Sequence, residues 1–458
     1  MAATPARQVA FEVLRRTFEH DAWTDRALRS AIRRHGLSGR ERAFAHRLAY
    51  GAVKRRGTSD HLAAALTRRP LRRLDPPVTA ALRLGLYELL FEAQGAEHAA
   101  VGEAVELAKG AAPGRRRRAA SGLVNAVLRR ASRERAELLG GLDDATPAGA
   151  AIAHSYPEWI TARLFAEDGA AGARSLLAAM NEPPETALRV NLLRTDRESV
   201  LERLGAAGEG LAPAEPDDGG SLLHPAEALV VSGPWGPELE SMLAVGDLVA
   251  QARASQAVVA VLDPRPGERI LDLCAGPGIK STAIAARMAD EGEVRAVELD
   301  PGRASQIGEL AERLGARSVR PEVADAAVGD LGEGYDRVLV DPPCTDLGAL
   351  ASRPDARWRK TADQAERLAE LQRTILARAA QAVRPGGTVV YSTCTISVAE
   401  NEEVVRAVLG AGAPLEPDDL GAEHPGLASP HDPRTLQSRP DRDGTDGFFI
   451  ARFRRALG

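Results

Sequence analysis

The stretch that decides the fold is RILDLCAGPGIK, residues 269–280. Its first five residues form the apolar run of a buried strand, and the pattern that follows residue 280 is that of a helix. Glycines at positions 276 and 278 allow the backbone of the intervening turn to approach a ligand closely. The start of the helix offers free N–H groups to acceptor atoms. The stretch therefore predicts a strand, a ligand-binding turn and a helix in succession.

Strand and helix patterns alternate on both sides of this stretch, from about residue 255 onward. Such alternation predicts a parallel sheet with crossover helices. We expect GFFIARFRR (447–455) to supply a final edge strand, and the Pro-, Asp- and Gly-rich residues 411–445 to form a loop. The expected strands are 269–273, 294–299, 320–323, 337–340 and 388–392, and the expected helices lie near 280–290, 301–315, 362–383 and 398–410.

The residues after the next two strands indicate which cofactor the turn binds. Glu298 closes the strand that follows, and a carboxylate there can accept both hydroxyls of a ribose. Asp300 competes for that role, although Pro301 behind it indicates a helix start. Asp325 could hold an adenine amino group or be an exposed loop residue. Because the turn lacks the G-x-G-x-x-G spacing of pyrophosphate binders, we predict S-adenosyl-L-methionine, which has no phosphate.

Two further stretches place thiols at strand ends. VLVDPPC brings Asp341 to the ligand edge of the sheet, and two prolines stiffen the turn that leads to Cys344. In YSTCTISVAENE a strand ends at Cys394. Ser397 with Glu400 fits a capping box, so we expect a helix to start three residues beyond this thiol and to favour its thiolate. A turn role for Asp341 and a packing role for a lone buried Cys are the alternatives.

These parts suit methylation of C5 of a pyrimidine. A thiolate that adds at C6 makes C5 nucleophilic enough to take a methyl group from a sulfonium. A carboxyl group near ring N3 would stabilise the charge that develops, and a base must then remove the C5 proton. One thiolate, one carboxyl group and a second thiol or a water would meet these needs.

The N-terminal part of the chain is helical in pattern and strongly basic. Residues 1–135 hold 27 Lys and Arg against 13 Asp and Glu, a net charge of +14, whereas the remainder carries −19. This asymmetry predicts a polyanionic partner, although an arginine-biased composition is an alternative. The run of four arginines at 115–118 is the best phosphate-contact candidate. Residues 183–250, with TALRVNLL and EALVVSG, predict a small α+β lobe.

Length and composition bound the class of protein. A chain of 458 residues allows two or three domains, and 44% hydrophobic with 27% charged residues is ordinary for a globular protein. No apolar run reaches the ~20 residues that span a bilayer. The N-terminus lacks a signal-peptide core, and three cysteines cannot all pair. We therefore expect a cytoplasmic protein that is not bound to a membrane, acts as a monomer and holds no metal ion.

DLCAGPGIK, VLVDPPC and YSTCTISVAENE resemble the three hallmark motifs of the NOL1/NOP2/Sun class of RNA (cytosine-5)-methyltransferases. The N-terminal AFEVLRR, LRLGLYELLF and GLVNAVLRR resemble a NusB-like RNA-binding domain, and the pairing of the two is similar to the bacterial Sun subfamily, which modifies small-subunit rRNA. The resemblance implies that Cys394 is the nucleophile, that Cys344 assists product release and that Asp341 contacts the cytosine. It implies that the cofactor contacts are Cys274, Ala275, Gly276, Pro277, Gly278, Ile279, Lys280, Glu298, Asp325 and Asp341.

The sequence therefore predicts a multidomain protein: an all-α NusB-like bundle (1–140), a helical connector with a small α+β RNA-facing lobe (141–250), and an α/β Rossmann-like class I methyltransferase domain (251–458). The expected activity is methyl transfer from S-adenosyl-L-methionine to C5 of a cytosine in 16S rRNA through a covalent adduct between cysteine and C6. The alternatives are a methyltransferase that acts on exocyclic amines of RNA and a non-catalytic NusB-like RNA-binding or antitermination factor.

Overall fold

The computed structural model describes residues 3–92, 97–112, 114, 116–208, 212–213, 221–233 and 235–457. The chain folds as two compact units. One comprises Met1–Glu182 with Leu350–Arg359, and the other comprises Pro183–Ala349 with Lys360–Gly458. We call them the helical unit and the sheet unit. The predicted division into three domains at 140 and 250 stays a prediction.

The helical unit is built from amphipathic helices around one apolar core. Pro76 begins α5, and Leu82, Leu86 and Leu89 are buried in that core. None of the helices in the described ranges is both long and apolar enough to cross a bilayer. The helices are α1 Pro5–Glu19, α2 Thr24–His35, α3 Gly39–Lys54, α4 Arg56–Thr67, α5 Pro76–Tyr87, α6 Glu97–Ala111, α7 Arg116–Arg133, α8 Arg135–Gly140, α9 Pro147–Ala153, α10 Glu158–Ala179 and α16 Ala356–Arg359.

The sheet unit begins with a small antiparallel sheet of strand order β2-β3-β1-β4. Leu188 and Val190 of β1 are buried with Leu239 and Met242 of α12, which confirms the α+β character of this lobe. Its elements are β1 Ala187–Val190, α11 Arg197–Ala206, β2 Ala212–Pro213, β3 Ala228–Ser232, α12 Pro237–Val245 and β4 Leu248–Ala250.

The large sheet has the strand order β10-β12-β9-β8-β5-β6-β7, and β11 pairs with β12 beside this path. The five strands from β9 to β7 run parallel, as predicted, while β12 and β10 are antiparallel to their neighbours. The strands are β5 Arg269–Leu273, β6 Glu293–Glu298, β7 Val319–Val323, β8 Tyr335–Val340, β9 Val383–Thr393, β10 Leu415–Pro417, β11 Leu436–Gln437 and β12 Phe449–Arg455.

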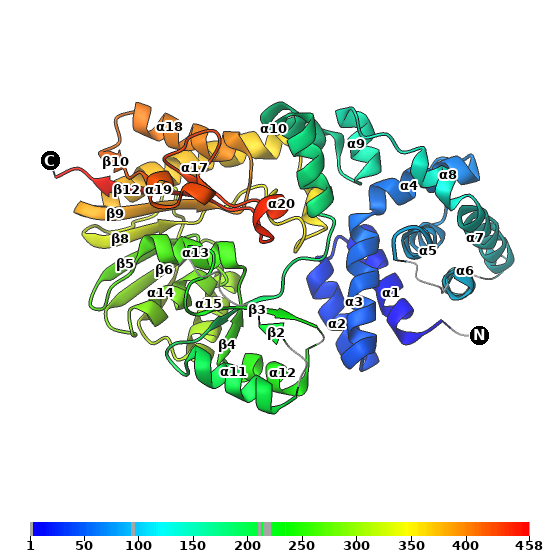
Figure 1. The fold of residues 1–458 in the computed structure, drawn as a ribbon, viewed down its shortest axis with the longest axis horizontal. Helices are drawn as coiled ribbons and strands as arrows, with labels where there is room; N and C mark the ends of the chain where they lie inside the picture. The colour runs from blue at the N-terminus through cyan, green and yellow to red at the C-terminus, as the bar shows by residue number, and fades with distance from the viewer. Residues whose placement is uncertain are drawn as a thin grey trace. The chain divides into compact units, whose positions relative to one another are not determined.

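Helices cover both faces of this sheet, which is the Rossmann-like arrangement (Figure 1). Ile270 packs on one side with α13, α14 and α15, and Leu271, the next residue along β5, packs on the other side with α17 and α18. This alternation follows from the two-residue period of a strand. The helices are α13 Arg253–Leu262, α14 Ile279–Arg287, α15 Pro301–Leu314, α17 Ala362–Ala382, α18 Glu402–Gly410, α19 Leu420–Glu423 and α20 Pro440–Asp443.

Two expectations about the C-terminal region were wrong. The last strand, β12, does not form the edge of the sheet, because it lies between β9 and β10. Phe449 and Phe453 are buried on one face and Ile450 on the other, so both faces of the strand are covered. The expected loop at 411–445 contains β10, α19, β11 and α20. Elements of two to four residues are too short to produce a periodic sequence signal.

Candidate active site

The predicted site residues lie at or just beyond the carboxyl ends of the parallel strands: most are at β5, β6, β8 and β9, and Asp325 is beyond β7. From β5 the chain adds β6 and β7 on one side, and β8 and β9 on the other. Such a reversal of strand order opens a crevice outside the carboxyl ends of the two central strands, where ligands bind in open α/β sheets. The glycine turn follows β5 and Asp341 follows β8, so both stand at this switch point.

The glycine turn is fastened to the end of β6 by one carboxylate. Glu298 accepts the Gly276 N–H at 3.0 Å and the Asp300 N–H at 3.1 Å. A Cβ at Gly276 would lie 2.5 Å from Glu298 Oε2, so a larger residue would push this carboxylate away. Asp300 instead caps α15 by accepting the Arg303 N–H at 2.8 Å. Glu298, rather than Asp300, is therefore the acid next to the turn.

The remaining residues of the turn close it tightly against the sheet and α15. The Ala275 N–H donates to the Val297 carbonyl at 2.9 Å. Gly278 has φ +98°, and a Cβ there would lie 3.1 Å from the Ile307 Cα atom, so the turn needs glycine to pack against α15. Pro277 comes directly before Gly278. Ile279, directly after Gly278, begins α14.

Two ionisable groups on β5 and its turn are withdrawn from solvent: Asp272 is fully buried and Cys274 is partly buried. Burial, and then the nearby carboxylates of Asp341 and Glu298, raise the pKa of Cys274, so this thiol stays protonated at neutral pH. Burial also raises the pKa of Asp272 to about 7. The Ser281 hydroxyl donates to Asp272 Oδ2 at 2.6 Å, while Oδ1 is buried without a partner among the described atoms. A ligand in the turn could supply the missing donor.

A salt bridge connects the glycine turn to β8. Lys280 Nζ lies 2.7 Å from Asp341 Oδ2, and its ammonium also stands over the Phe448 ring at 5.1 Å from the centroid. The Asp341 N–H donates to the Leu273 carbonyl at 3.3 Å. Asp341 therefore lies beside the glycine turn.

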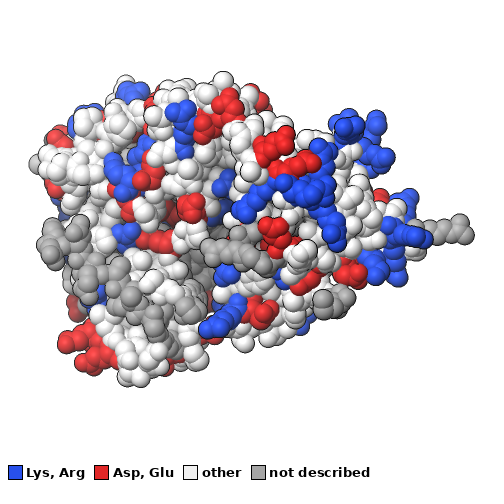
Figure 2. Space-filling model, turned by 45° about the vertical axis from the view of Figure 1, so that its right-hand side comes forward, with Lys and Arg blue, Asp and Glu red and all other residues white. Residues whose placement is uncertain are grey.

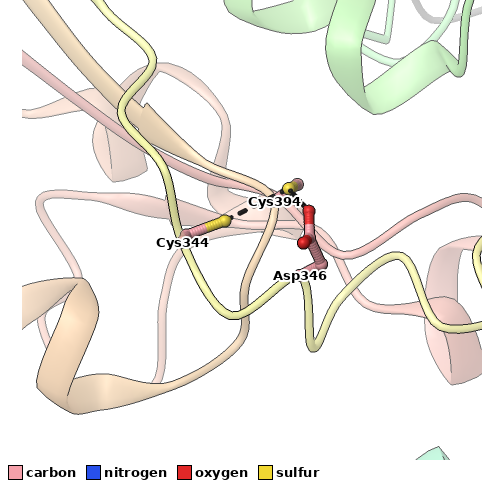
Figure 3. Close-up of side chains that lie close together, drawn as sticks. All are labelled: Cys344, Asp346 and Cys394. Atoms are coloured by element: carbon pink, nitrogen blue, oxygen red, sulfur yellow. Dashed lines mark hydrogen bonds between the residues drawn. The ribbon is translucent and has the colours of Figure 1, made fainter. Parts of the chain in front are cut away.

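The two remaining thiols meet although they are 50 residues apart in the chain. Cys344 Sγ lies 3.2 Å from Cys394 Sγ, and the two side chains point toward one another from the loops that follow β8 and β9 (Figure 3). The Gly348 N–H donates to the Cys394 carbonyl at 3.0 Å, which holds the two loops together. Cys344 is buried and Cys394 is partly exposed. The second thiol is therefore the more accessible one.

Sequence reasoning missed Asp346 and Lys360. Cys394 Sγ donates to Asp346 Oδ1 at 3.0 Å, and Figure 3 shows this carboxylate beside the thiol pair. Lys360 Nζ lies 3.5 Å from Asp346 Oδ2 and donates to the Cys344 carbonyl at 2.9 Å. An acid two residues beyond Cys344 was a usable signal. Lys360 gave no signal, since only the fold brings it to the thiols.

The expected capping box beyond Cys394 does not form. Ser397 makes no side-chain capping bond, residues 398–400 form a single 3₁₀ turn, and α18 begins at Glu402. The Glu400 carboxylate turns inward and accepts the Thr345 N–H at 2.9 Å and the Gln372 amide at 3.1 Å. Glu400 therefore stabilises the loop that carries Cys344, and α18 starts farther from Cys394 than expected.

Asp325 stands apart from the other predicted residues. It lies two residues beyond the end of β7, and its carboxylate accepts the Ala327 N–H at 2.8 Å. The Ala324 N–H beside it donates to the Glu298 carbonyl at 3.1 Å. Asp325 is therefore on the same edge as Glu298, but its side-chain bond is local.

Arginines gather on the surface of the helical unit (Figure 2). Arg116 Nη1 lies 3.2 Å from Asp75 Oδ1, which joins the start of α7 to the segment between α4 and α5. We call the exposed arginines of these two segments the arginine patch. Arg115 of the predicted run lies outside the described residues. The patch comprises Arg68, Arg69, Arg72, Arg73, Arg116, Arg117 and Arg118.

Comparison with known proteins shows the family to which the chain belongs. Residues 259–454 match the family model of the 16S rRNA methyltransferase RsmB/F, residues 4–133 match the NusB family, and residues 156–220 match the ferredoxin-like domain of RsmF/B-like methyltransferases. "Probable ribosomal RNA small subunit methyltransferase B" of Bacillus subtilis is 33% identical over 99% of this chain and 100% of its own. The chain belongs to the RsmB/F methyltransferase family. The N-terminal match confirms that the helical bundle is NusB-like.

Further relatives extend over most of the chain. Ribosomal RNA small subunit methyltransferase B of Pseudomonas putida is 33% identical over 90% of both chains. The crystal structure of PH0851 superposes with a TM-score of 0.77 at 25% identity and covers 99% of each chain. A methyltransferase homologue from Pyrococcus horikoshii has a TM-score of 0.58 at 26% identity, over 67% of this chain and 97% of its own. The first of these structures therefore shares the fold of nearly the whole chain, and the second shares the fold of about two thirds of it.

Proposed function

We propose that this methyltransferase transfers a methyl group from S-adenosyl-L-methionine to C5 of a cytosine in 16S rRNA, and that Cys394 forms a transient bond to C6 of that base. The observation that carries the proposal is the 3.2 Å approach of Cys394 Sγ to Cys344 Sγ beyond the carboxyl ends of β8 and β9. The names of the relatives support rRNA of the small subunit as the substrate.

The residues of the glycine turn fit this cofactor. Gly276 lets the backbone lie directly against Glu298, where a Cβ would clash at 2.5 Å, Glu298 closes the adjoining strand, and Asp272 Oδ1 has no hydrogen-bond partner among the described atoms. The ribose hydroxyls would go to Glu298, and the turn from Cys274 to Lys280 would line the remainder of the ligand, with Asp325 near the adenine. When bound, the cofactor supplies an electrophilic methyl group on a sulfonium.

The chemistry at the thiols follows from their contacts. As Cys394 Sγ bonds to C6, its proton passes to Asp346 Oδ1, to which it already donates. The pair of electrons released toward C5 makes this carbon nucleophilic, and a proton donated by the Asp341 carboxyl group to ring N3 would stabilise the negative charge that develops there. After methyl transfer, Cys344 or a water assists the removal of the C5 proton. The C–S bond to Cys394 then breaks and restores the aromatic ring.

Transfer to an exocyclic amine would leave both thiols incidental. An amine nitrogen needs no covalent activation, so nothing in that reaction would favour two sulfurs that approach from separate loops. A NusB-like factor without catalysis would not need the glycine turn. The contacts of Cys344 and Cys394 therefore favour the C5 reaction.

Replacement of each cysteine tests the proposal. Cys344→Ala leaves addition intact but impairs elimination, so it should accumulate a covalent adduct between protein and RNA that migrates slowly in a denaturing gel. Cys394→Ala should abolish 5-methylcytosine formation and give no adduct, while binding of S-adenosyl-L-methionine persists in calorimetry. The double variant is the matched control and should also give no adduct. Normal turnover of Cys394→Ala would refute the covalent mechanism. Nucleotide-resolution mapping of 5-methylcytosine in 16S rRNA identifies the target.

A further inference from the structure

Buried hydrogen bonds join the residues that follow the two thiols of the site. Thr345 is the residue after Cys344. Thr395 is the residue after Cys394, and the two threonine hydroxyl oxygens lie 2.9 Å apart. Both the hydroxyl and the N–H of Thr345 donate to the carboxylate of Glu400, the N–H at 2.9 Å. One carboxylate is therefore connected to both loops that carry the thiols, and all of these contacts lie in the sheet unit.

The direction of these hydrogen bonds follows from the acceptor at their end. An ionised carboxylate only accepts, so Thr345 gives its single hydroxyl proton to Glu400. Thr395 must then donate to the Thr345 oxygen, while its own oxygen accepts the Ser397 N–H at 3.3 Å. The donors therefore run in one direction, from one thiol loop through the other to Glu400.

A second contact of Glu400 supports the residue before Cys344. The side-chain amide of Gln372, on α17, donates to Glu400 Oε2 at 3.1 Å and to the Pro343 carbonyl at 2.9 Å. Gln372 is fully buried, as are Glu400 and Thr345. The residues on both sides of Cys344 are therefore held by Glu400 or by its partner on α17.

The next residue, Asn401, holds the residues on both sides of Cys394. Its amide donates to the Thr395 carbonyl at 3.0 Å, and its Oδ1 accepts the Thr393 hydroxyl at 2.5 Å. Asn401 is fully buried, as is Glu400 before it. Two consecutive side chains thus fix the backbone that flanks both thiols.

These contacts should make the arrangement of the thiols stiff. Burial of a carboxylate is costly unless hydrogen-bond donors surround it. Separation of the two loops would take donors away from Glu400, which is fully buried and cannot replace them with water. A thiol is itself only a weak donor and acceptor. The 3.2 Å approach of Cys344 Sγ to Cys394 Sγ (Figure 3) is therefore maintained by the hydrogen bonds around it and not by the sulfurs themselves.

We propose that Glu400 is a positioning residue that sets the distance between Cys344 and Cys394, so that both thiols reach the same C5–C6 bond of the target base. The proposal deepens the roles of the two cysteines and rests on the proposed function. Addition at C6 needs Cys394 alone, whereas removal of the C5 proton also draws on Cys344. A looser pair should therefore slow release of the product more than formation of the covalent bond.

Crosslinking of the two thiols measures their proximity without RNA. Diamide takes two electrons and two protons from Cys344 and Cys394, becomes a hydrazine and leaves a disulfide, whose formation is timed by peptide mass spectrometry. Glu400→Met keeps the length of the side chain and removes both oxygens, so crosslinking should slow about tenfold or more. Glu400→Gln should retain most of the wild-type rate, because its amide can donate to the Thr345 oxygen while its remaining oxygen still accepts.

A matched control and a correction for reactivity separate positioning from folding. Glu402 is also buried and accepts the Ser429 hydroxyl. Glu402→Met should therefore destabilise the sheet unit without slowing the crosslink. Each crosslinking rate is divided by the rate at which iodoacetamide alkylates Cys394, so that the ratio reports proximity and not reactivity. Thr345→Val removes one hydroxyl and keeps the shape of the side chain, so it should lower this ratio several-fold.

Steady-state kinetics with RNA test the consequence for the reaction. Glu400→Met should lower kcat with little change in KM for RNA, and it should accumulate the covalent adduct expected for Cys344→Ala. Glu402→Met should accumulate none, because loss of folded protein lowers the amount of active enzyme without favouring one step over another. A fall in kcat without adduct in Glu400→Met, while Cys344→Ala gives one, would contradict the role in product release.

Three results of the crosslinking would overturn the proposal: a wild-type ratio in Glu400→Met, a ratio in Glu400→Gln as low as in Glu400→Met, or an equal loss in Glu402→Met. If Glu400→Met fails to fold, an unchanged ratio in Thr345→Val would overturn it instead. Because the crosslink needs no RNA, a low ratio in Glu400→Met without any adduct in Cys344→Ala would refute the proposed function and leave the positioning of the thiols by Glu400 standing.

Discussion

Asp272 should make the stability of the sheet unit depend on pH. Its carboxyl group, one residue before the end of β5, is fully buried, and burial raises its pKa from 3.8 to about 7. Between these values the folded protein holds a proton that the unfolded chain releases. The free energy of unfolding is therefore greatest below the unfolded-state pKa of 3.8. It falls as pH rises toward the folded-state pKa of about 7. This direction is opposite to that of an ordinary salt-bridged carboxylate.

The magnitude follows from the two pKa values. Over the pH range between them, stability falls by about 1.4 kcal/mol for each rise of one in pH, so this group alone should cost the wild type about 2 kcal/mol between pH 5.5 and pH 8. Asp272→Asn keeps the size of the side chain and has no proton to lose. The difference in unfolding free energy between the variant and the wild type should then rise by about 2 kcal/mol over this range, in favour of the variant.

Hydrogen–deuterium exchange of peptides that cover β5, measured in urea and corrected for intrinsic rates, reports this free energy for the sheet unit. Asp336→Asn is a suitable control. Against the effect of burial, bonds from the Arg269 N–H and from Arg384 keep the pKa of Asp336 below its usual value, so its contribution is constant above about pH 5. A difference for Asp272→Asn that does not change with pH would refute the reasoning.

Three further changes test other contacts. Gly276→Ala should weaken binding of S-adenosyl-L-methionine about tenfold or more in calorimetry, since its Cβ would lie 2.5 Å from Glu298 Oε2; unchanged affinity would mean that the cofactor lies elsewhere. Arg357→Met should destabilise the helical unit by about 2–4 kcal/mol in thermal unfolding, because Asn181 and several buried carbonyls lose their donor. Arg118→Gln should lower the slope of log affinity for RNA against log salt by roughly 0.7–0.9 if it contacts a phosphate.

The sequence by itself determined the strand–turn–helix at the glycine turn. It also determined that the neighbouring strands run parallel. β5 begins and ends at the residues expected, since a buried strand followed by glycines and a helix start is a local signal. Lys280 and Asp341, and Cys344 and Cys394, were singled out from their motifs, and the structure brings each pair together. Residues at the carboxyl ends of adjacent parallel strands must meet at one edge.

The tertiary structure alone decided which side chains lie next to Cys344 and Cys394. Lys360 Nζ lies 3.5 Å from Asp346 Oδ2 within the sheet unit, although the two residues stand at opposite ends of the segment between β8 and α17. Ser397 and Glu400 had the spacing of a capping box, but the inward contacts of Glu400 with Thr345 and Gln372 prevailed. Local patterns specify backbone conformation within a few residues. Partners distant in the chain depend on packing, which no short stretch of sequence encodes.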